Sequence, residues 1–370
     1  MKKWILSIAF ASALTLSWSQ QQGCWPLYRG DSELKGRTPV VLPDKPELLW
    51  TFTAGDNIKS SPVVCGGYVV FGTVSGEVIA TGIDGKERWR FSSGNGIEAP
   101  ALILENRVYL GNLDGVLFCL DLATGKELWS YATEGQINGS PNYASDGKST
   151  MIIVGSYDYF LHAVDAQTGK LRWKYESDNY INGTAAVSGG MAVFGGCDGF
   201  LHIIDTRTGA LKKKMNIATY VAGSAVVTGG QAYLGDYDGK FSCVDILTGK
   251  VLWQFANPQP DQPFIASPSL SGGFVLIGSR DKNLYCFNGK NGALLWKYPT
   301  GGRIDASPVI AGDKVLSVNM RGDLQIFSLQ DGKLLWSYLV GFPLAGNPAV
   351  AGNRFYVGAG DGRLYCFGSK

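Results

Sequence analysis

The chain has 370 residues, of which 50 are glycine, 12% are aromatic and only 17% are charged. Lysine and arginine total 33 against 31 acidic residues, so the chain lacks the basic field that nucleic-acid binding requires. Abundant glycine with many large aromatic side chains is typical of a turn-dense β protein, and no long stretch places apolar residues at helical spacing. These features predict an all-β protein and exclude nucleic acid as a partner.

Residues 1–19 differ from the rest of the chain. Lys2 and Lys3 precede an apolar run over 4–18, and Ser17-Trp18-Ser19 supplies the small residues of a signal-peptidase site. We therefore expect a signal peptide over residues 1–19, a mature chain that begins near Gln20 and has no transmembrane segment, and export to the periplasm or the extracellular space.

Two alternatives remain for this N-terminus. The first is a membrane anchor, although the apolar run is shorter than the ~20 residues of a spanning helix. The second is a lipid anchor at Cys24, which follows Gly23 as lipoprotein signals require, whereas Gln21 and Gln22 stand where such signals carry an aliphatic and a small residue.

One pattern recurs along the remaining sequence: an aspartate, a Thr-Gly-Lys turn and a tryptophan, as in the segment from Asp121 to Trp129. Copies follow one another every 39 to 44 residues, which indicates one supersecondary unit repeated eight times. Seven of the eight final positions hold a tryptophan, and the other holds Lys213; the tryptophans are Trp50, Trp89, Trp129, Trp173, Trp253, Trp296 and Trp336.

Each unit reads as four short antiparallel strands. In the fifth unit we expect strands over 221–227, 231–235, 240–245 and 250–255, with a hairpin at Asp238-Gly239, because a primed turn needs the positive φ that these residues tolerate. Four such strands per forty residues describe a propeller blade.

The two ends of the repeat array complete each other. Residues 344–367 supply three strands and then stop, whereas residues 46–52 supply a fourth strand without the three before it. Pairing the N-terminal strand with the C-terminal blade removes the exposed sheet edges of an open array. The sequence therefore predicts an eight-bladed β-propeller over 46–370, preceded by an N-terminal extension over 20–45.

The repeated tryptophan has an expected structural role. It occupies a fixed place in the outermost strand, from which it is expected to stack on the next blade and bury roughly 150–250 Å². Lys213 would lack this contact, so the interface at Lys213 is predicted to be the weakest of the eight.

The cysteines fall into two groups. Four occupy one repeat position that alanine or isoleucine fills elsewhere, which indicates a small apolar core site rather than disulfides: Cys119, Cys243, Cys286 and Cys366. Cys24, Cys65 and Cys197 lie outside that position, and a disulfide from Cys24 to one of the other two is open. No metal-binding Cys/His spacing is present in the sequence.

The residue that opens each innermost strand should face the central funnel. The eight equivalent positions are Lys59, Glu98, Asn138, Asn182, Ala222, Ile265, Asp305 and Ala345. The polar members, together with Arg303, are the candidate binding residues, and Tyr180 and Tyr220 are expected to surround the same opening. The alternative is that Lys59 and Glu98 simply pair with each other around a water-filled channel.

No catalytic or metal-binding residue is predicted. His162 and His202 occupy matching positions in consecutive repeats, and this position also accepts Phe118, Ser242 and Tyr285. Such tolerance indicates a strand position rather than a metal or catalytic site.

The Asp-x-x-Thr-Gly-Lys-x-x-Trp repeat resembles that of the pyrroloquinoline-quinone-like (PQQ-like) propeller family. The opening Trp25-Pro-Leu-Tyr-Arg-Gly-Asp31 is similar to a segment common in its exported members. The resemblance implies the propeller fold but two kinds of function. Some members are quinone- and calcium-dependent dehydrogenases, and others are non-enzymatic envelope proteins, such as the propeller lipoprotein of the outer-membrane β-barrel assembly machinery.

The insertion-poor repeat favours the second kind of function. Quinone dehydrogenases of this family are longer, and the adjacent cysteine pair of several members is absent here, as is a haem-attachment motif. We expect a secreted or cell-envelope, non-enzymatic scaffold that binds a protein or peptide and has no cofactor. The alternatives are a small PQQ-dependent dehydrogenase that uses calcium and oxidises an alcohol or sugar, and a glycan-binding propeller.

Overall fold

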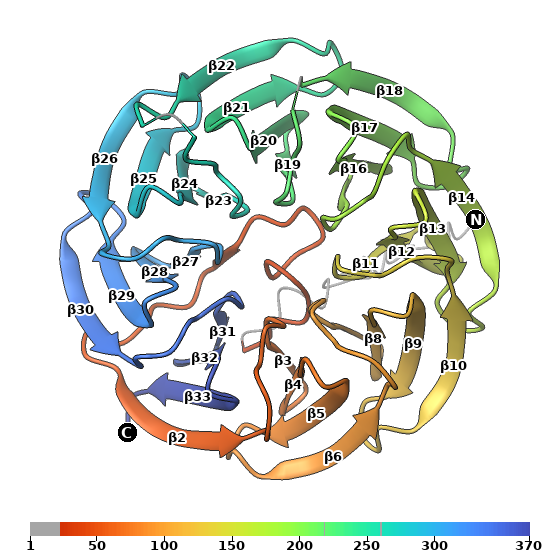
Figure 1. Ribbon diagram of the computed structural model, residues 1–370, viewed down its shortest axis with the longest axis horizontal. Coiled ribbons are helices and arrows are strands. Elements are labelled where there is room, and N and C mark those ends of the chain that lie inside the picture. Colours follow the sequence, from red (N-terminus) through yellow and green to blue (C-terminus); the bar gives the residue numbers. More distant parts are fainter. Residues whose placement is uncertain (1–22, 218, 260) are drawn as a thin grey trace, which may run out of the picture.

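A computed structural model describes residues 23–370 except 218 and 260; the predicted signal peptide lies outside the described residues. Eight sheets surround a central axis, and each contains four antiparallel strands (Figure 1). The predicted all-β, eight-bladed propeller is confirmed. Within the described ranges, no helix has the length and apolar character needed to cross a membrane.

Blades 1 to 4 each comprise four consecutive strands, numbered from the axis outward. Their bounds are β3 (Val63–Cys65), β4 (Tyr68–Gly72), β5 (Glu77–Gly82) and β6 (Glu87–Ser92); β7 (Leu102–Leu104), β8 (Arg107–Gly111), β9 (Val116–Asp121) and β10 (Glu127–Ala132); β11 (Asn142–Ser145), β12 (Thr150–Gly155), β13 (Phe160–Asp165) and β14 (Leu171–Glu176); and β15 (Ala186–Ser188), β16 (Met191–Gly195), β17 (Phe200–Asp205) and β18 (Leu211–Asn216).

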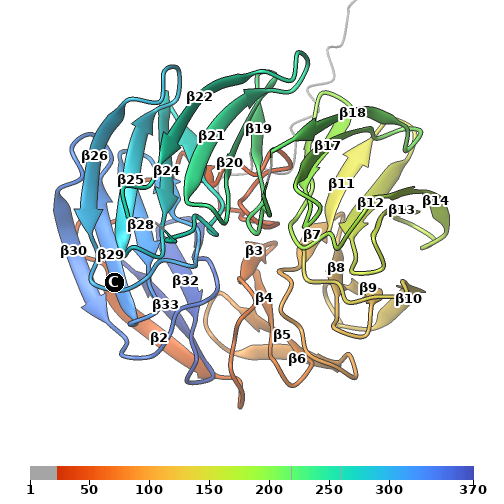
Figure 2. The ribbon, with the colours of Figure 1, turned by 45° about the horizontal axis from the view of Figure 1, so that its top comes forward.

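Blades 5 to 8 follow the same plan, with additions from the N-terminal region in blades 7 and 8. Their bounds are β19 (Val226–Thr228), β20 (Gln231–Gly235), β21 (Lys240–Asp245) and β22 (Val251–Ala256); β23 (Ser269–Ser271), β24 (Phe274–Gly278), β25 (Asn283–Asn288) and β26 (Leu294–Pro299); β1 (Arg37–Thr38), β27 (Val309–Ala311), β28 (Lys314–Val318), β29 (Asp323–Ser328) and β30 (Leu334–Leu339); and β31 (Ala349–Ala351), β32 (Arg354–Gly358), β33 (Arg363–Gly368) and β2 (Glu47–Thr53). In the tilted view of Figure 2, the strands of each blade lie side by side around the axis.

Blade 8 joins the two ends of the chain. Strand β2 pairs antiparallel with β33, and Trp50 lies opposite Cys366. The predicted closure by the N-terminal strand is therefore confirmed.

The innermost strands are shorter than the sequence predicts. In blade 5 the expected strand over 221–227 is wrong in extent, because β19 covers only Val226–Thr228. The residues before β19 run along the funnel, where the N–H of Ser224 donates to Ser267 Oγ of the next blade instead of to a strand in its own sheet.

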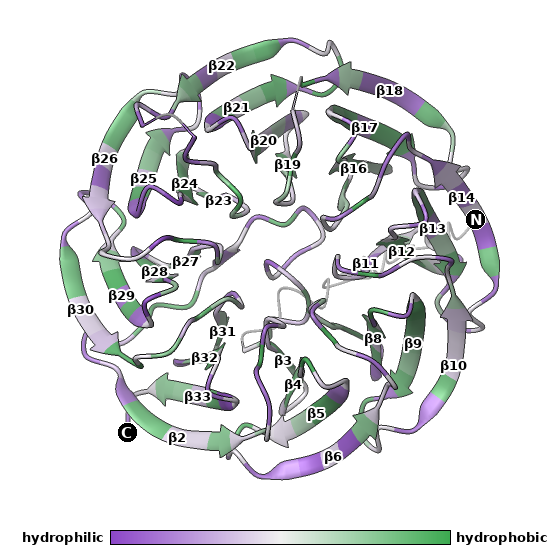
Figure 3. Cartoon of the chain, in the orientation of Figure 1, coloured by the Kyte–Doolittle hydropathy of each residue, from purple (hydrophilic) through white to green (hydrophobic). Residues whose placement is uncertain are grey.

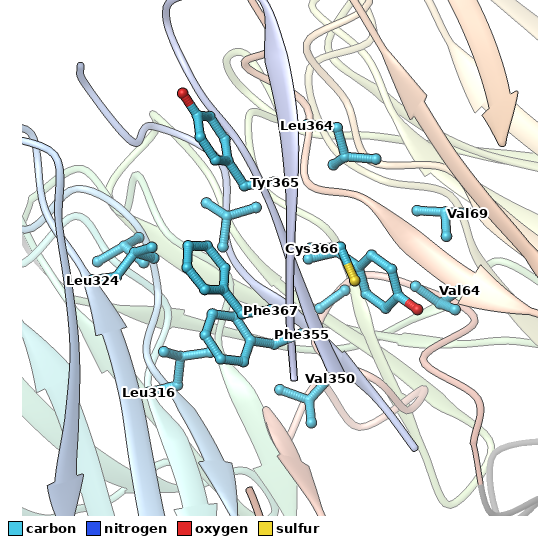
Figure 4. Close-up of a cluster of buried hydrophobic side chains, with 14 of the residues drawn as sticks. Val64, Val69, Leu316, Leu324, Val350, Phe355, Leu364, Tyr365, Cys366 and Phe367 are labelled. Carbon is cyan, nitrogen blue, oxygen red and sulfur yellow. The ribbon is translucent and has the colours of Figure 1, made fainter. Parts of the chain in front are cut away.

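The hydrophobic core lies between and within the blades. The close-up in Figure 4 shows one cluster around blade 8, where Phe355 and Phe367 stack with ring centroids 5.0 Å apart. The four cysteines of the shared repeat position are free and buried in such clusters, as predicted. Outer strands are more polar, and Figure 3 shows hydrophilic residues along β6, β14 and β18.

The tryptophans and the Thr-Gly-Lys turns of neighbouring blades contact each other. The Trp89 indole N–H donates to the carbonyl of Leu122 at 2.8 Å, and five other tryptophans make the equivalent bond at 2.8–3.2 Å. Gly125 of the next turn has φ +70°, and a Cβ there would lie 2.6 Å from the Trp89 ring. Glycine is therefore required at this position for two reasons: the positive φ and the close approach of the indole.

Lys213 corrects one expectation. Its Nζ donates to the carbonyl of Leu247 at 2.6 Å, one residue beyond the carbonyl equivalent to those that the indoles bind, and its side chain approaches Gly249. The lysine thus retains the polar part of the contact, and only the aromatic stacking is lost.

Residues 24–45, which we call the strap, follow the inside of the ring. Strap carbonyls accept hydrogen bonds from equivalent N–H groups of six innermost strands, in chain order: Val64, Ile103, Val187, Val227, Leu270 and Ile310. In blade 3 the side-chain amide of Asn142 makes the corresponding bond to Ser32 O at 2.9 Å. In Figure 1 the first part of the strap crosses the inside of the ring, where it bonds the inner edges of blades 1 to 7, and its last residues run outward to β2.

Arg29 fixes the middle of the strap. Its side chain is fully buried, and the guanidinium donates to Pro308 O at 2.7 Å, Pro268 O at 2.8 Å and Ser269 Oγ at 2.5 Å. Desolvation by burial lowers the pKa of Arg29 to about 10. The guanidinium is therefore tied to blades 6 and 7 from the ring interior.

A disulfide anchors the start of the strap. Cys24 is bonded to Cys65 at the end of β3, which answers the question that the sequence left open, and Cys197 is free. A sulfur in a disulfide has no valence left for a lipid thioether, so the alternative of a lipid anchor at Cys24 is inconsistent with the structure.

Candidate functional site

The two ends of the central channel differ. The strap lies at the end where the innermost strands finish, whereas the end where they begin opens into a funnel of about 440 Å³. All eight positions expected from the sequence line this funnel, from Lys59 in blade 1 to Ala345 in blade 8. Tyr28 of the strap also lines the funnel and bonds Ser267 Oγ at 2.9 Å.

Seven polar side chains, each two residues after one of these eight funnel positions, form a second layer in the channel, which we call the belt. Each belt member except Ser140 accepts a hydrogen bond from the backbone N–H of the preceding blade's member, and the order is Ser140, Thr184, Ser224, Ser267, Ser307, Asn347 and Ser61. Pro100 holds the equivalent place in blade 2 and interrupts the belt, because it has neither a hydroxyl nor an N–H. Sequence reasoning missed the belt, although its signal was a hydroxyl or amide residue followed by proline or alanine in each repeat.

The charged groups of the funnel are paired. Lys59 Nζ lies 2.7 Å from Glu98 Oε1, which is the pairing that the sequence raised as an alternative. Asp305 contacts Arg280 at 3.0 Å and Arg303 at 3.5 Å, and its hydrogen bond raises the pKa of Arg280. Arg303 itself does not line the funnel; its side chain is 51% exposed at the rim.

The side of the funnel formed by blades 3 and 4 is polar but uncharged. Asn138, Asn182 and Gln136 present amide groups there. Tyr157, which the sequence pattern did not single out, donates from its hydroxyl to Asn182 Oδ1 at 2.8 Å. Asn182 donates in turn to the carbonyl of Ala222 at 3.3 Å.

Tyr180 and Tyr220 lie outside the funnel lining, on the same face of the ring. Each precedes a blade, and each carbonyl accepts the N–H of a hairpin-turn residue, Cys197 and Tyr237 respectively. Both rings are exposed, Tyr180 at 41% and Tyr220 at 55%.

Both histidines are buried structural links between blades. His162 lies between Asp158 Oδ2 at 2.9 Å and Tyr131 Oη at 3.0 Å, and Tyr131 belongs to the preceding blade. His202 repeats this arrangement with Asp198 and Tyr175 one blade later. Burial lowers the pKa of His202.

The quinone and calcium of the dehydrogenase members would need acidic ligands for the metal and cations for the quinone in the funnel. Among the described residues, no group of three or more His, Cys, Asp and Glu side chains is placed to hold a metal ion. Pyrroloquinoline quinone carries three carboxylates, and the cations at the funnel, Lys59, Arg280 and Arg303, already contact Glu98 or Asp305.

The fold and its open funnel define a PQQ-like β-propeller. The chain belongs to the family described as "Outer membrane protein assembly factor BamB", whose model matches residues 39–179, 114–262, 157–301 and 259–369 in overlapping segments.

Solved structures show the same fold at low sequence identity. BamB from Moraxella catarrhalis has a TM-score of 0.73 and 19% identity, covering 88% of this chain and 98% of that one. The quinohemoprotein alcohol dehydrogenase from Comamonas testosteroni has a TM-score of 0.77 and 14% identity over 94% of this chain and 80% of its own. The computationally designed Ika8 protein has a TM-score of 0.75 and 18% identity, covering 87% of this chain and 100% of that one. No curated protein matches the sequence.

Proposed function

We propose that this protein is an exported, non-enzymatic scaffold of the cell envelope that binds a protein partner on the funnel face. The single observation that carries the proposal is the open funnel end of the channel, which is rimmed by short loops and is free of a metal-ligand cluster among the described residues. The strap crosses the other end and lines a cavity of about 1060 Å³ there. The family's description as an outer membrane protein assembly factor supports a role in handling envelope proteins.

The rim over blades 6 to 8 has the composition of a protein-binding surface. Three arginines and one phenylalanine, which we call the arginine arc, are Arg280, Arg303, Arg321 and Phe342. The backbone packs closely here, since a Cβ on Gly301 would lie 3.2 Å from the Arg321 guanidinium and one on Gly322 would lie 2.6 Å from the backbone oxygen of Phe342. Arginine and aromatic side chains are enriched among residues that dominate protein interfaces.

The charge of the arginine arc favours an acidic partner segment. Asp305 and Asp323 are the carboxylates paired with its three guanidinium groups. Arg303 and Arg321 keep side-chain exposures of 51% and 60%. We therefore propose a partner that presents one or more carboxylates together with an apolar side chain for Phe342.

Site-specific photo-cross-linking in the native envelope tests this proposal. A photoreactive residue at Phe342 should capture one defined envelope protein, whereas the same residue at Leu128, equally exposed on the outer rim, should not. The charge reversals Arg303→Glu and Arg321→Glu should reduce the adduct at least fivefold. Arg88→Glu, in the outermost strand β6 of blade 1, should leave it unchanged. Equal adducts at Phe342 and Leu128 would contradict docking on the funnel face.

A cofactor assay tests the absence of enzymatic activity. Purified protein mixed with pyrroloquinoline quinone and calcium should show no stoichiometric uptake by absorbance and no dye reduction with alcohols or sugars. Turnover in this assay would replace the scaffold with a dehydrogenase.

A further inference from the structure

Five tyrosines gather on the funnel face over blades 3 to 5. We call this group the tyrosine arc: Tyr157, Tyr159, Tyr180, Tyr220 and Tyr237. The rings of Tyr157 and Tyr180 stack with centroids 4.6 Å apart at an interplanar angle of 26°, and Tyr159 lies 5.2 Å from Tyr180. Tyr220 and Tyr237 form a second pair, edge to face at 6.4 Å. The arc therefore offers a row of aromatic rings beside the funnel.

The propeller fold does not require these rings. Tyr157 and Tyr237 occupy the hairpin-turn position that Leu113, Arg280 and Gly360 fill in other blades, each with the same backbone hydrogen bond to the preceding loop. Except for Tyr157, the rings remain 41–55% exposed, so they contribute little to the core. A group of exposed aromatic rings that folding does not need indicates a binding surface.

The funnel wall beside the tyrosine arc determines which ligand fits. Among the described lining residues, those of blades 3 to 6 include no carboxylate, ammonium or guanidinium group. Asn138, Asn182 and Gln136 supply amides there, and each amide both donates and accepts hydrogen bonds. A ligand for this wall is therefore uncharged, rich in hydroxyl groups, and has flat apolar faces for the rings.

From this combination we infer that the tyrosine arc and the adjoining funnel wall form a binding site for a neutral glycan. A sugar ring places its C–H face on the exposed ring of Tyr180, which Tyr157 supports by stacking against it. Its hydroxyls reach the amides of Asn138 and Gln136. The spread of the arc over three blades accommodates several consecutive sugar units. This site shares no residue with the arginine arc, although Arg280 of that arc lies near enough to Tyr237 to interact with it electrostatically. The inference does not depend on the proposed protein partner.

Calorimetric titration with defined oligosaccharides tests the inference. The probes are cellohexaose, chitohexaose and mannohexaose, with hexagalacturonate as an anionic comparison. At least one neutral probe should bind, and Tyr180→Ala should weaken that binding tenfold or more. Tyr180→Phe should retain it, because the stacking face remains. Phe342→Ala is the matched control, since this ring is 48% exposed on the opposite side of the same face and should not affect binding.

Thermal melts of each variant show whether it is folded. If Tyr180→Ala does not fold, the comparison between wild type and Tyr180→Phe still tests the site. Failure of all three neutral probes to bind at millimolar concentration would overturn the inference, as would binding of hexagalacturonate alone. Equal binding by wild type and by folded Tyr180→Ala would overturn it too. A photoreactive residue at Tyr180 that captures an envelope protein, with no glycan bound, would assign the arc to a protein instead.

Discussion

The two ends of the channel are stabilised by different parts of the chain. At the strap end, backbone carbonyls of residues 24–45 bind the N–H groups of the innermost strands, and Arg29 and the Cys24–Cys65 disulfide fix the path. At the funnel end, side chains of the belt carry the contacts from blade to blade.

Because of this difference, the strap end mainly stabilises the ring, whereas the funnel end carries the side chains that could distinguish one ligand from another. Backbone contacts need a defined path but few particular side chains, so most single substitutions along the strap leave these contacts unchanged. Side-chain contacts change with single residues, as Pro100 shows by interrupting the belt. The funnel end is therefore where this propeller acquires surfaces of its own, the tyrosine arc and the arginine arc.

The largest effect is expected at the strap end, from Arg29→Ala. Each hydrogen bond from a charged donor contributes about 1.5–3 kcal/mol, and Arg29 makes three, so we expect a loss of about 4 kcal/mol or more in the free energy of unfolding. Urea denaturation measures it. Arg280→Ala at the funnel end is the comparison and should cost about 1 kcal/mol or less, because its ion pair is partly exposed. Equal losses would break the contrast between the two ends.

The disulfide gives the next effect. Cys24→Ser removes a bond between residues 41 apart in sequence, and a cross-link of that span stabilises by about 4 kcal/mol in the chain-entropy relation. We expect a lower urea midpoint for this variant and the same midpoint for wild type after reduction. Cys197→Ser should change little. A Cys24→Ser variant as stable as wild type would mean that the hydrogen bonds alone hold the strap.

A pH-dependent effect is expected at the funnel end. Burial alone would raise the pKa of Asp158, but hydrogen bonds from His162 and from the backbone N–H groups of Phe160 and Glu134 outweigh it and hold the pKa at about 2. Because the folded pKa is below the unfolded value, Asp158 stabilises the fold above pH 4. This contribution, about 1–2 kcal/mol once partial solvent screening is allowed for, is lost as the pH falls toward 2.

Asp158→Asn should remove this part of the acid sensitivity. Its stability should fall less steeply than that of wild type between pH 4 and pH 2, as monitored by denaturation at each pH. Asp178→Asn is the comparison: the bond from Lys214 also lowers the pKa of Asp178, but its carboxylate is 73% exposed, so solvent screening should leave a smaller change than at Asp158. Parallel curves for wild type and Asp158→Asn would contradict the assignment.

The smallest effect is expected at Lys213, beside the turns of the strap end. Lys213→Trp should restore the aromatic contact with Gly249 and raise stability by about 1 kcal/mol, observed as a higher Tm. Lys213→Ala should lower the Tm, since it removes the bond to Leu247. A lower Tm for Lys213→Trp would show that the lysine is the better fit.

The repeat made most of the ring predictable from the sequence. The spacing of the tryptophans determined the number of blades, and the incomplete units at the two ends indicated how β2 closes blade 8. The eight residues of the funnel lining followed from the same register, because equivalent positions of a repeat lie at equivalent radii.

The strap and the two arcs were not predictable in the same way. Strap contacts are made mostly by backbone carbonyls, which leave no side-chain signal, and residues 20–45 have no repeat against which to align them. Pairing Cys24 with Cys65 needed the path of the strap past the end of β3. The tyrosine arc left a readable signal, since Tyr157 and Tyr237 share one turn position, but its meaning depended on the loop tyrosines lying beside them.

The strap also has a consequence for how this protein can evolve. Its carbonyls from Trp25 to Gly36 meet the innermost strands of blades 1 to 7 in order, so its length matches a fixed number of blades. Duplication or loss of a single blade would shift the register between the strap carbonyls and the innermost strands of all later blades. It would also misplace Arg29 relative to Pro268 and Pro308. The number of blades is thus specified twice: the repeats set it at eight, and a short segment without repeats matches seven of them in order.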